Sequence, residues 1–149
     1  MIKLIDVAHV NLNVTDLDRA IKFYTEMLGF RVVVQFEGLA LLNFGQYRDG
    51  IEGMGYGFHD LALYRVPTPA PEDYRTRAGM NHVALRLRTP EEVDQAASEL
   101  EAKGAKVLKG PLTHKEDRDR YLYIEDPDRN VIELVASTVE GWPEKYLRE

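Results

Sequence analysis

The fold is decided by two stretches of sequence, AHVNLNVTDLDRAIKFYTEMLGFRVV at residues 8–33 and NHVALRLRTPEEVDQAASELEAKGAKVL at residues 81–108. Each begins with apolar and polar residues in alternation, which is typical of a strand, and continues as an amphipathic helix. His82 follows His9 by 73 residues, and the helix-ending Gly104 follows Gly29 by 75. The chain therefore contains an internal repeat, and its two halves are expected to be structural copies.

The start of each helix has a recognisable capping signal. Thr15 is expected to cap the first helix, with Asp18 three residues later in a position like that of a capping box. Thr89 is expected to cap the second, with Pro90 in the first turn and Glu92 completing a capping box. Both signals favour a helix directly after the first strand of each half.

Each half continues with short strand-like segments, which end in HDLALYRV and NVIELVAS. The sequence therefore predicts an α+β fold of paired βαβββ modules that form a cup-shaped mixed sheet. Its parts are a first module at about residues 1–67, a proline-containing linker at about 68–78, a second module at about 79–137, and a C-terminal tail at 138–149.

Composition excludes several classes of protein. The 149 residues are 44% hydrophobic and 30% charged, which is typical of one globular domain. The net charge of −6 and the lack of a basic cluster argue against nucleic-acid binding. The absence of cysteine excludes disulfides and thiolate chemistry. With no membrane-spanning stretch and no signal-peptide pattern, a cytoplasmic location is expected.

The segment DPDRNVIELVAS at residues 126–137 places Glu133 within an apolar strand. A carboxylate there is costly to bury unless a positive group meets it. If the two modules pack about a pseudo-twofold axis, His9 and His82 converge on Glu133. Two histidines and one carboxylate form the facial triad that holds a divalent metal and leaves coordination positions open. This set suits Fe(II), with Mn(II) or Zn(II) as alternatives. Each histidine alone could equally be a surface or hydrogen-bonded residue, and Glu133 could pair with an arginine.

The sequence resembles the vicinal oxygen chelate superfamily, which includes glyoxalase I, bleomycin-resistance proteins, methylmalonyl-CoA epimerase and extradiol catechol dioxygenases. The matching segments are AHVNLNVTDLDRAIKFYTEMLGF, NHVALRLRTPEEVDQA and YIEDPDRNVIELV, which together span nearly the whole chain. The resemblance implies the glyoxalase/bleomycin resistance/dihydroxybiphenyl dioxygenase-like fold. It also implies that His9, His82 and Glu133 are metal ligands.

The position of a fourth ligand separates the branches of this superfamily. Glyoxalase I and the epimerases resemble each other in taking one from the last strand of the first module. Constant spacing places Asp60 opposite Glu133, whereas local matching of DLALYRV to VIELVAS places Ala62 there. Both residues lie on one face of a strand, so alternation leaves the two possibilities open. If Asp60 is the fourth ligand, the chain is expected to be a glyoxalase or epimerase that uses Ni(II), Co(II) or Zn(II).

Three further residues resemble the active-site residues of extradiol dioxygenases. His59 begins the segment HDLALY, and His114 and Tyr123 lie 19 and 10 residues before Glu133. The resemblance implies catalytic roles for all three. His59 could instead be a solvated strand start, His114 part of a solvated loop, and Tyr123 a packing residue. Strict alternation also places His59 on the face opposite Ala62, so its role requires an irregular strand start.

The sequence therefore predicts an Fe(II)-dependent extradiol dioxygenase that cleaves a catecholic aromatic with O2. The alternatives are a glyoxalase- or epimerase-like lyase or isomerase and a non-catalytic binding protein for a small ligand. The resemblance implies a homodimer, and Trp142 and Tyr146 in the tail are expected to pack on the partner or over the cup. An apolar pocket is expected from six residues: Phe36, Leu41, Phe44, Met54, Tyr56 and Phe58.

Overall fold

The computed structural model describes residues 2–46 and 59–147. The chain divides into two compact units between Tyr74 and Arg75, inside the proline-containing segment. Met54, Tyr56 and Phe58, which the sequence suggests for the apolar pocket, lie outside the described residues. Within the described part, none of the helices has the length and apolar character needed to cross a membrane.

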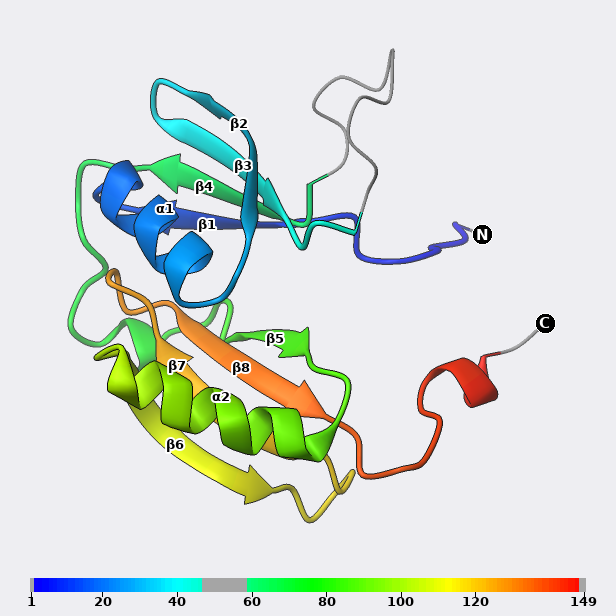
Figure 1. The fold of residues 1–149 in the computed structure, drawn as a ribbon. Coiled ribbons are helices and arrows are strands. Elements are labelled where there is room, and N and C mark those ends of the chain that lie inside the picture. The colour runs from blue at the N-terminus through cyan, green and yellow to red at the C-terminus, as the bar shows by residue number, and fades with distance from the viewer. Residues whose placement is uncertain (1, 47–58, 148–149) are drawn as a thin grey trace. The chain divides into compact units, whose positions relative to one another are not determined.

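The first unit has the predicted order βαβββ. Its elements are β1 (Val10–Val14), α1 (Leu17–Glu26), β2 (Arg31–Phe36), β3 (Leu39–Asn43) and β4 (Leu61–Arg65). The strands form one sheet in the order β1-β4-β3-β2. Strand β1 runs parallel to β4, whereas the other neighbours are antiparallel. Helix α1 packs on one face of this sheet, as Figure 1 shows.

The second unit repeats this architecture, which confirms the internal repeat. It contains β5 (Val83–Arg86), α2 (Pro90–Ala102), β6 (Lys106–Thr113), β7 (Arg120–Glu125) and β8 (Val131–Ala136). Its sheet order is β5-β8-β7-β6, again with one parallel pair, β5 and β8. Helix α2 lies across β6, β7 and β8 (Figure 1). The α+β class and the paired βαβββ modules are therefore confirmed.

Each unit has its own apolar core between helix and sheet. In the first, Tyr24 of α1 and Leu42 of β3 are fully buried; in the second, Val93 of α2 and Ile132 of β8 are. Strand β1 alternates as expected, because Leu12 and Val14 are buried while Asn11 and Asn13 are exposed. The helix thus covers one face of each sheet, and the polar residues of the edge strands occupy the other face.

The helix caps were predicted correctly in one unit and incorrectly in the other. Thr89 and Glu92 form the complete capping box expected for α2. The expectation of Thr15 as the cap of α1 is wrong, because Asp16 caps that helix and accepts a hydrogen bond from the backbone of Arg19 at 3.0 Å. Aspartate is as good a cap as threonine or better, so the neighbouring residue takes the position.

The turn between β7 and β8 is held by one buried carboxylate. Asp126 is 3% exposed, and its Oδ1 accepts hydrogen bonds from the backbone N–H groups of Asp128 and Asn130, each at 2.8 Å. Its Oδ2 accepts one from the Asn130 side chain at 2.9 Å. These bonds favour one geometry of the hairpin, and hairpin geometry fixes strand register. In that register Tyr123 lies opposite Glu133.

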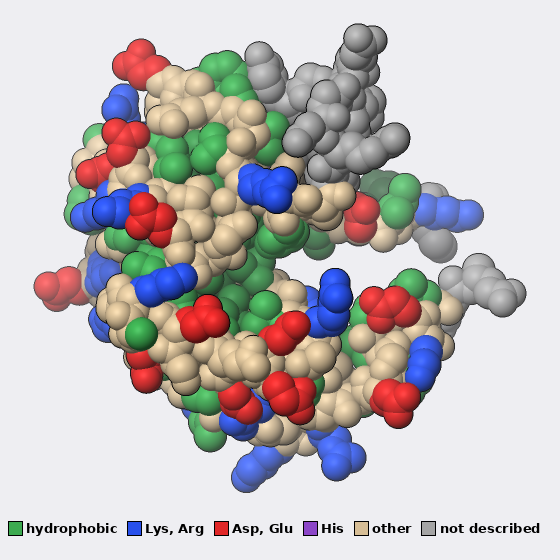
Figure 2. Space-filling model, viewed as in Figure 1, with side chains coloured by type: hydrophobic (Ala, Val, Ile, Leu, Met, Phe, Trp, Pro, Cys, Tyr) green, Lys and Arg blue, Asp and Glu red, His purple; other side chains and the backbone are tan. Residues whose placement is uncertain are grey.

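The visible surface carries charges of both signs without a large field of one sign. Figure 2 shows acidic and basic side chains interspersed over the face in view. This distribution agrees with the modest net charge of −6.

Candidate functional site

Glu133 lies in the middle of the second sheet and is 6% exposed. Strand β8 is flanked by β5 and β7, and the register places Ala84 and Tyr123 beside Glu133. Because paired residues point to the same face of a sheet, the Glu133 carboxylate and the Tyr123 ring share the face opposite α2. The buried carboxylate that the sequence predicted is therefore present, and its partners are the next question.

The first partner is His82, the residue before β5. Its Nε2 lies 3.0 Å from Oε2 of Glu133, and its Nδ1 lies 2.7 Å from Oδ1 of Asn81. Both ring nitrogens thus face an oxygen acceptor. A neutral imidazole has one N–H and one lone pair, so it can donate to only one of these two oxygens. If Asn81 accepts the Nδ1 proton, Nε2 has a free lone pair on the Glu133 side, which is the arrangement of a metal-ligating histidine.

The second partner is His114, whose Nε2 lies 3.0 Å from the other carboxylate oxygen, Oε1. His114 follows β6, and its backbone N–H donates to the carbonyl of Asp119 at 2.9 Å, which closes the hairpin loop between β6 and β7. The ring of Tyr121 stacks on the imidazole, with centroids 3.7 Å apart and planes inclined by 12°. The loop in which the sequence placed His114 is therefore anchored, and the histidine faces the site.

Tyr123 completes the cluster on this carboxylate. Its ring meets His82 edge-on at 5.1 Å between centroids. Burial raises the pKa of the Tyr123 phenol, and the neighbouring negative charge of Glu133, together with a hydrogen bond to it, raises the pKa further. The phenol therefore keeps its proton at neutral pH and is available as a hydrogen-bond donor.

His9 and His59 come together in the first unit. Their rings lie 4.5 Å apart between centroids, with planes inclined by 34°. His9 precedes β1, and His59 precedes β4, which begins only at Leu61. His59 therefore lies outside the regular strand, where strand alternation does not fix its face, and its catalytic role stays a prediction.

Strand register resolves the choice between Asp60 and Ala62. Asn11 and Ala84 occupy equivalent positions, because they are separated by the same 73 residues as His9 and His82. Ala84 pairs with Glu133, and Asn11 pairs with Ala62. Ala62 is thus the counterpart of Glu133 and is itself 3% exposed.

Asp60 has a different task in the first unit. Its Oδ2 accepts hydrogen bonds from the backbone N–H of Phe44 at 3.1 Å and from the side chain of Gln46 at 2.9 Å. The carboxylate therefore holds the chain that follows β3. This arrangement does not favour Asp60 as a fourth metal ligand.

Among residues 2–46 and 59–147, no group of three or more histidine, aspartate and glutamate side chains is arranged to hold a metal ion. The three predicted ligands are divided between the units, with His9 in the first and His82 and Glu133 in the second. The triad therefore stays a prediction, supported by the contact of its two members in the second unit.

Two residues near the carboxylate were not found from the sequence. Tyr121 alternates with Tyr123 along β7, and the hairpin register brings it onto His114. Asn81 lay within the repeat but was not assigned a role. Its position directly before His82 was the available signal, since a histidine ligand usually has a hydrogen-bond acceptor on its second nitrogen.

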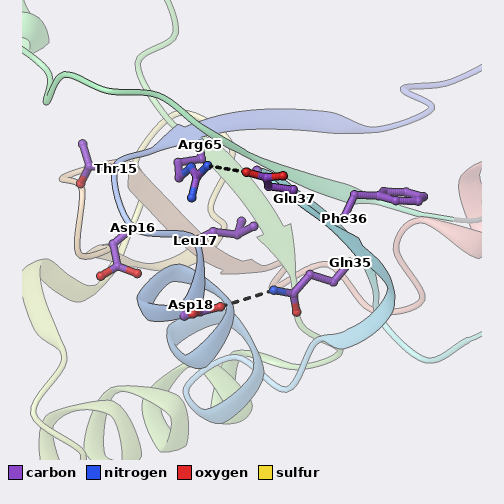
Figure 3. Close-up of a pocket in the computed structure, with 9 residues that line it drawn as sticks. Thr15, Asp16, Leu17, Asp18, Gln35, Phe36, Glu37 and Arg65 are labelled. Carbon is purple, nitrogen blue, oxygen red and sulfur yellow. Dashed lines mark hydrogen bonds and ion pairs between the residues drawn. The ribbon is translucent and has the colours of Figure 1, made fainter.

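A separate cavity of about 340 Å³ lies in the first unit at the start of α1. Figure 3 shows Asp18 bonded to Gln35 and Arg65 paired with Glu37 in its wall. Phe36, which the sequence suggested for the apolar pocket, also lines it. The cavity is polar and open, and it contains none of the histidines, so the chemistry is better placed at Glu133.

Curated proteins with similar sequences span most of the chain. The chain is 31% identical over 133 residues to the uncharacterized protein YqjT of Bacillus subtilis, covering 86% of this chain and 96% of that protein. It is 24% identical over 130 residues to a probable lactoylglutathione lyase of Synechocystis, covering 87% and 94% of the two chains.

A solved structure has the same fold. The crystal structure of a glyoxalase/bleomycin resistance protein/dioxygenase from Nocardioides matches with a TM-score of 0.65 and 24% identity, covering 95% of this chain and 88% of that one. At this level of identity the match concerns the fold alone.

The family model described as Glyoxalase/Bleomycin resistance protein/Dioxygenase superfamily matches residues 6–134. This match includes both modules, the histidines at their starts and Glu133. The superfamily generally binds a divalent metal, and many of its members are enzymes. On the repeat, the fold and this match, the chain belongs to the glyoxalase/bleomycin resistance protein/dioxygenase superfamily.

Proposed function

We propose that the protein is a metal-dependent dioxygenase of the extradiol type that opens the ring of a catecholic aromatic. The observation that carries the proposal is the cluster on Glu133. One carboxylate has His82 at one oxygen and His114 at the other, with the neutral phenol of Tyr123 beside it. The site thus combines two expected metal ligands with two groups able to donate or accept protons.

The residue types of the predicted triad suit a divalent metal. His9, His82 and Glu133 would hold the metal. Asn81 would accept a hydrogen bond from Nδ1 of His82, which leaves Nε2, beside Glu133, to bind it. Fe(II) is the proposed ion, because three protein ligands leave positions for both substrate oxygens and O2; Mn(II) is the nearest alternative. When bound, the metal supplies a template on which catechol and O2 meet. Ala62 in place of a fourth carboxylate supports this open arrangement.

The other residues would orient substrate and move protons. Tyr123 would donate a hydrogen bond from its neutral phenol to a substrate oxygen. His114, held against Glu133, would accept and return the proton of a substrate hydroxyl. His59, in contact with His9, would provide a proton on the O2 side. In the overall reaction one ring C–C bond next to the diol breaks and both atoms of O2 enter the product, so no external reductant is needed.

The test is oxygen uptake by protein reconstituted anaerobically with Fe(II), measured across a panel of catechols. We expect uptake together with a ring-cleaved product. His59→Phe should retain iron while turnover falls by about 10²-fold or more, as expected for the loss of a general acid or base. His9→Ala is the control without metal. Protein that retains iron and consumes no oxygen with any catechol would refute the proposal.

A second candidate is a metal-dependent lyase or isomerase of the glyoxalase type. It is favoured by the similarity to a probable lactoylglutathione lyase over 87% of the chain. The register at Ala62 argues against it, since a fourth protein carboxylate is absent from that position. Isomerisation of the hemithioacetal of methylglyoxal and glutathione, dependent on Ni(II), Co(II) or Zn(II) and independent of O2, would identify this activity.

We also propose that the chain forms a homodimer. Leu4 and Ile5 are 90% and 96% exposed in the segment before β1, and exposed apolar residues gathered in this way favour association. Light scattering during size-exclusion chromatography should give twice the mass of 17.1 kDa. A monomer at micromolar concentration would contradict the proposal.

A further inference from the structure

We propose that Tyr121 is a positioning residue that fixes the imidazole of His114 against Glu133, an inference that rests on the proposed function of His114. Tyr121 belongs to none of the metal or proton-transfer sets described above. It is 4% exposed, and its ring is the one stacked on His114. The proposal assigns a role to this buried aromatic ring in the alignment of a proton carrier.

The need for such a residue follows from the geometry of a histidine side chain. The torsion that turns an imidazole about its bond to Cβ has broad, shallow minima, so the rotamer alone does not fix the ring plane. The hydrogen bond from Nε2 of His114 to Glu133 fixes one direction in that plane. A second contact over the ring face is required to fix the plane itself, and the parallel stack with Tyr121 supplies it.

The register of the hairpin explains why these two rings meet. Leu112 pairs directly with Tyr121, and His114 lies two residues beyond Leu112 on the same face. His114 and Tyr121 are therefore diagonal neighbours across β6 and β7, a separation that aromatic side chains can bridge. The irregularity between Lys109 and Leu112 sets this register, so the stack is a product of strand pairing.

The neighbours of Tyr121 hold its ring in turn. The Tyr123 ring lies 5.3 Å away between centroids, and the ammonium of Lys109 lies 5.8 Å from the centre of the Tyr121 ring. An ammonium over an aromatic face is attracted by the charge distribution of the ring. Tyr121 is thus packed from several sides and presents a rigid surface to His114.

The experiment compares the wild type with Tyr121→Leu, which removes the ring, and Tyr121→Phe, which keeps it. In the Fe(II) enzyme we expect Tyr121→Leu to lower kcat by about 10²-fold, as misplacement of a catalytic group does. KM and iron content should stay near the wild-type values, because no substrate or metal contact is lost. Tyr121→Phe should restore wild-type kcat.

A readout independent of activity is the NMR spectrum of the histidine ring protons, with His114 assigned through His114→Gln. A stacked ring shifts those protons upfield. Tyr121→Leu should return them downfield and Tyr121→Phe should leave them unchanged. The signals of His59, in the first unit, should not move in either variant, which shows that the first unit is unaffected.

The proposal is overturned if Tyr121→Leu leaves the His114 signals in place or has the kcat of the wild type. It is also overturned if the kcat of Tyr121→Phe falls as far as that of Tyr121→Leu. A wild type that consumes no oxygen refutes the proposed function instead. The NMR comparison then still decides whether Tyr121 fixes the imidazole.

Discussion

At the scale of single residues, the buried carboxylate of Glu133 is the feature that organises the site. Burying a charge is unfavourable unless partners compensate for it, and here each carboxylate oxygen has an imidazole nitrogen at 3.0 Å. Compensation by His82 and His114 allows Glu133 to remain within the sheet. The same arrangement holds the Glu133 carboxylate in the position of a proposed metal ligand.

The counterpart of Glu133 in the first unit offers a direct test of the coordination number. Ala62→Glu places a carboxylate at the equivalent position of β4, where the present side chain is 3% exposed. In metal-free protein we expect a loss of roughly 3 kcal/mol in the free energy of unfolding, because the new charge is buried without a partner. A bound metal should offset that loss, and oxygen uptake should disappear because a fourth protein ligand closes a position.

Urea unfolding with and without Mn(II) measures the first effect, and the oxygen electrode measures the second. Ala62→Gln is the matched control, since it has nearly the same volume without the charge and should gain no extra stability from the metal. If the stability of Ala62→Glu does not respond to metal, β4 does not present this position to the metal site.

At the scale of elements, the pairing of β6 with β7 decides whether His114 faces Glu133. A shift of one residue in register reverses the faces of a strand, and β6 contains two such shifts before it reaches His114. Gly110 lies in the second, with φ at 96°, and a Cβ there would meet the carbonyl oxygen of Tyr121 at 2.6 Å. The close approach of the two strands therefore requires glycine.

Gly110→Ala should destabilise the protein by about 3 kcal/mol, the upper part of the range for a residue forced into an unfavourable backbone conformation. The matched control is Gly104→Ala, at φ of 80° with nothing within 4 Å of the added carbon. That substitution should cost only about 1 kcal/mol, from backbone conformation alone. Urea denaturation gives both values, and equal losses would show that the contact with Tyr121 is relieved at little cost.

The elements could be predicted from the sequence, whereas the details of the site could not. The repeat, the order of elements and the burial of Glu133 follow from periodicity and capping signals, which are local. The choice between Asp60 and Ala62 required strand register, because both residues have the same parity. The stack of Tyr121 on His114 depends on the two irregularities in β6, and no local pattern indicates how far these shift the pairing.

At the scale of the whole molecule, the proposed metal ligands belong to both compact units, so metal binding should depend on both. Saturating Mn(II), at about 100 times its dissociation constant, should stabilise the wild type by about 2.7 kcal/mol. His9→Ala and His82→Ala should each abolish most of this gain, because each removes one proposed ligand, one from each unit. His114→Gln, which alters a proton carrier, should retain it.

Thermal unfolding and direct titration with Mn(II) measure these effects. The informative result would be the opposite pattern, in which His9→Ala binds metal as the wild type does and His114→Gln does not. The ligands would then be His82, His114 and Glu133, all within the second unit, where both imidazoles already lie at the carboxylate. His114 would become a ligand, and the proton-transfer role would pass to Tyr123 and His59.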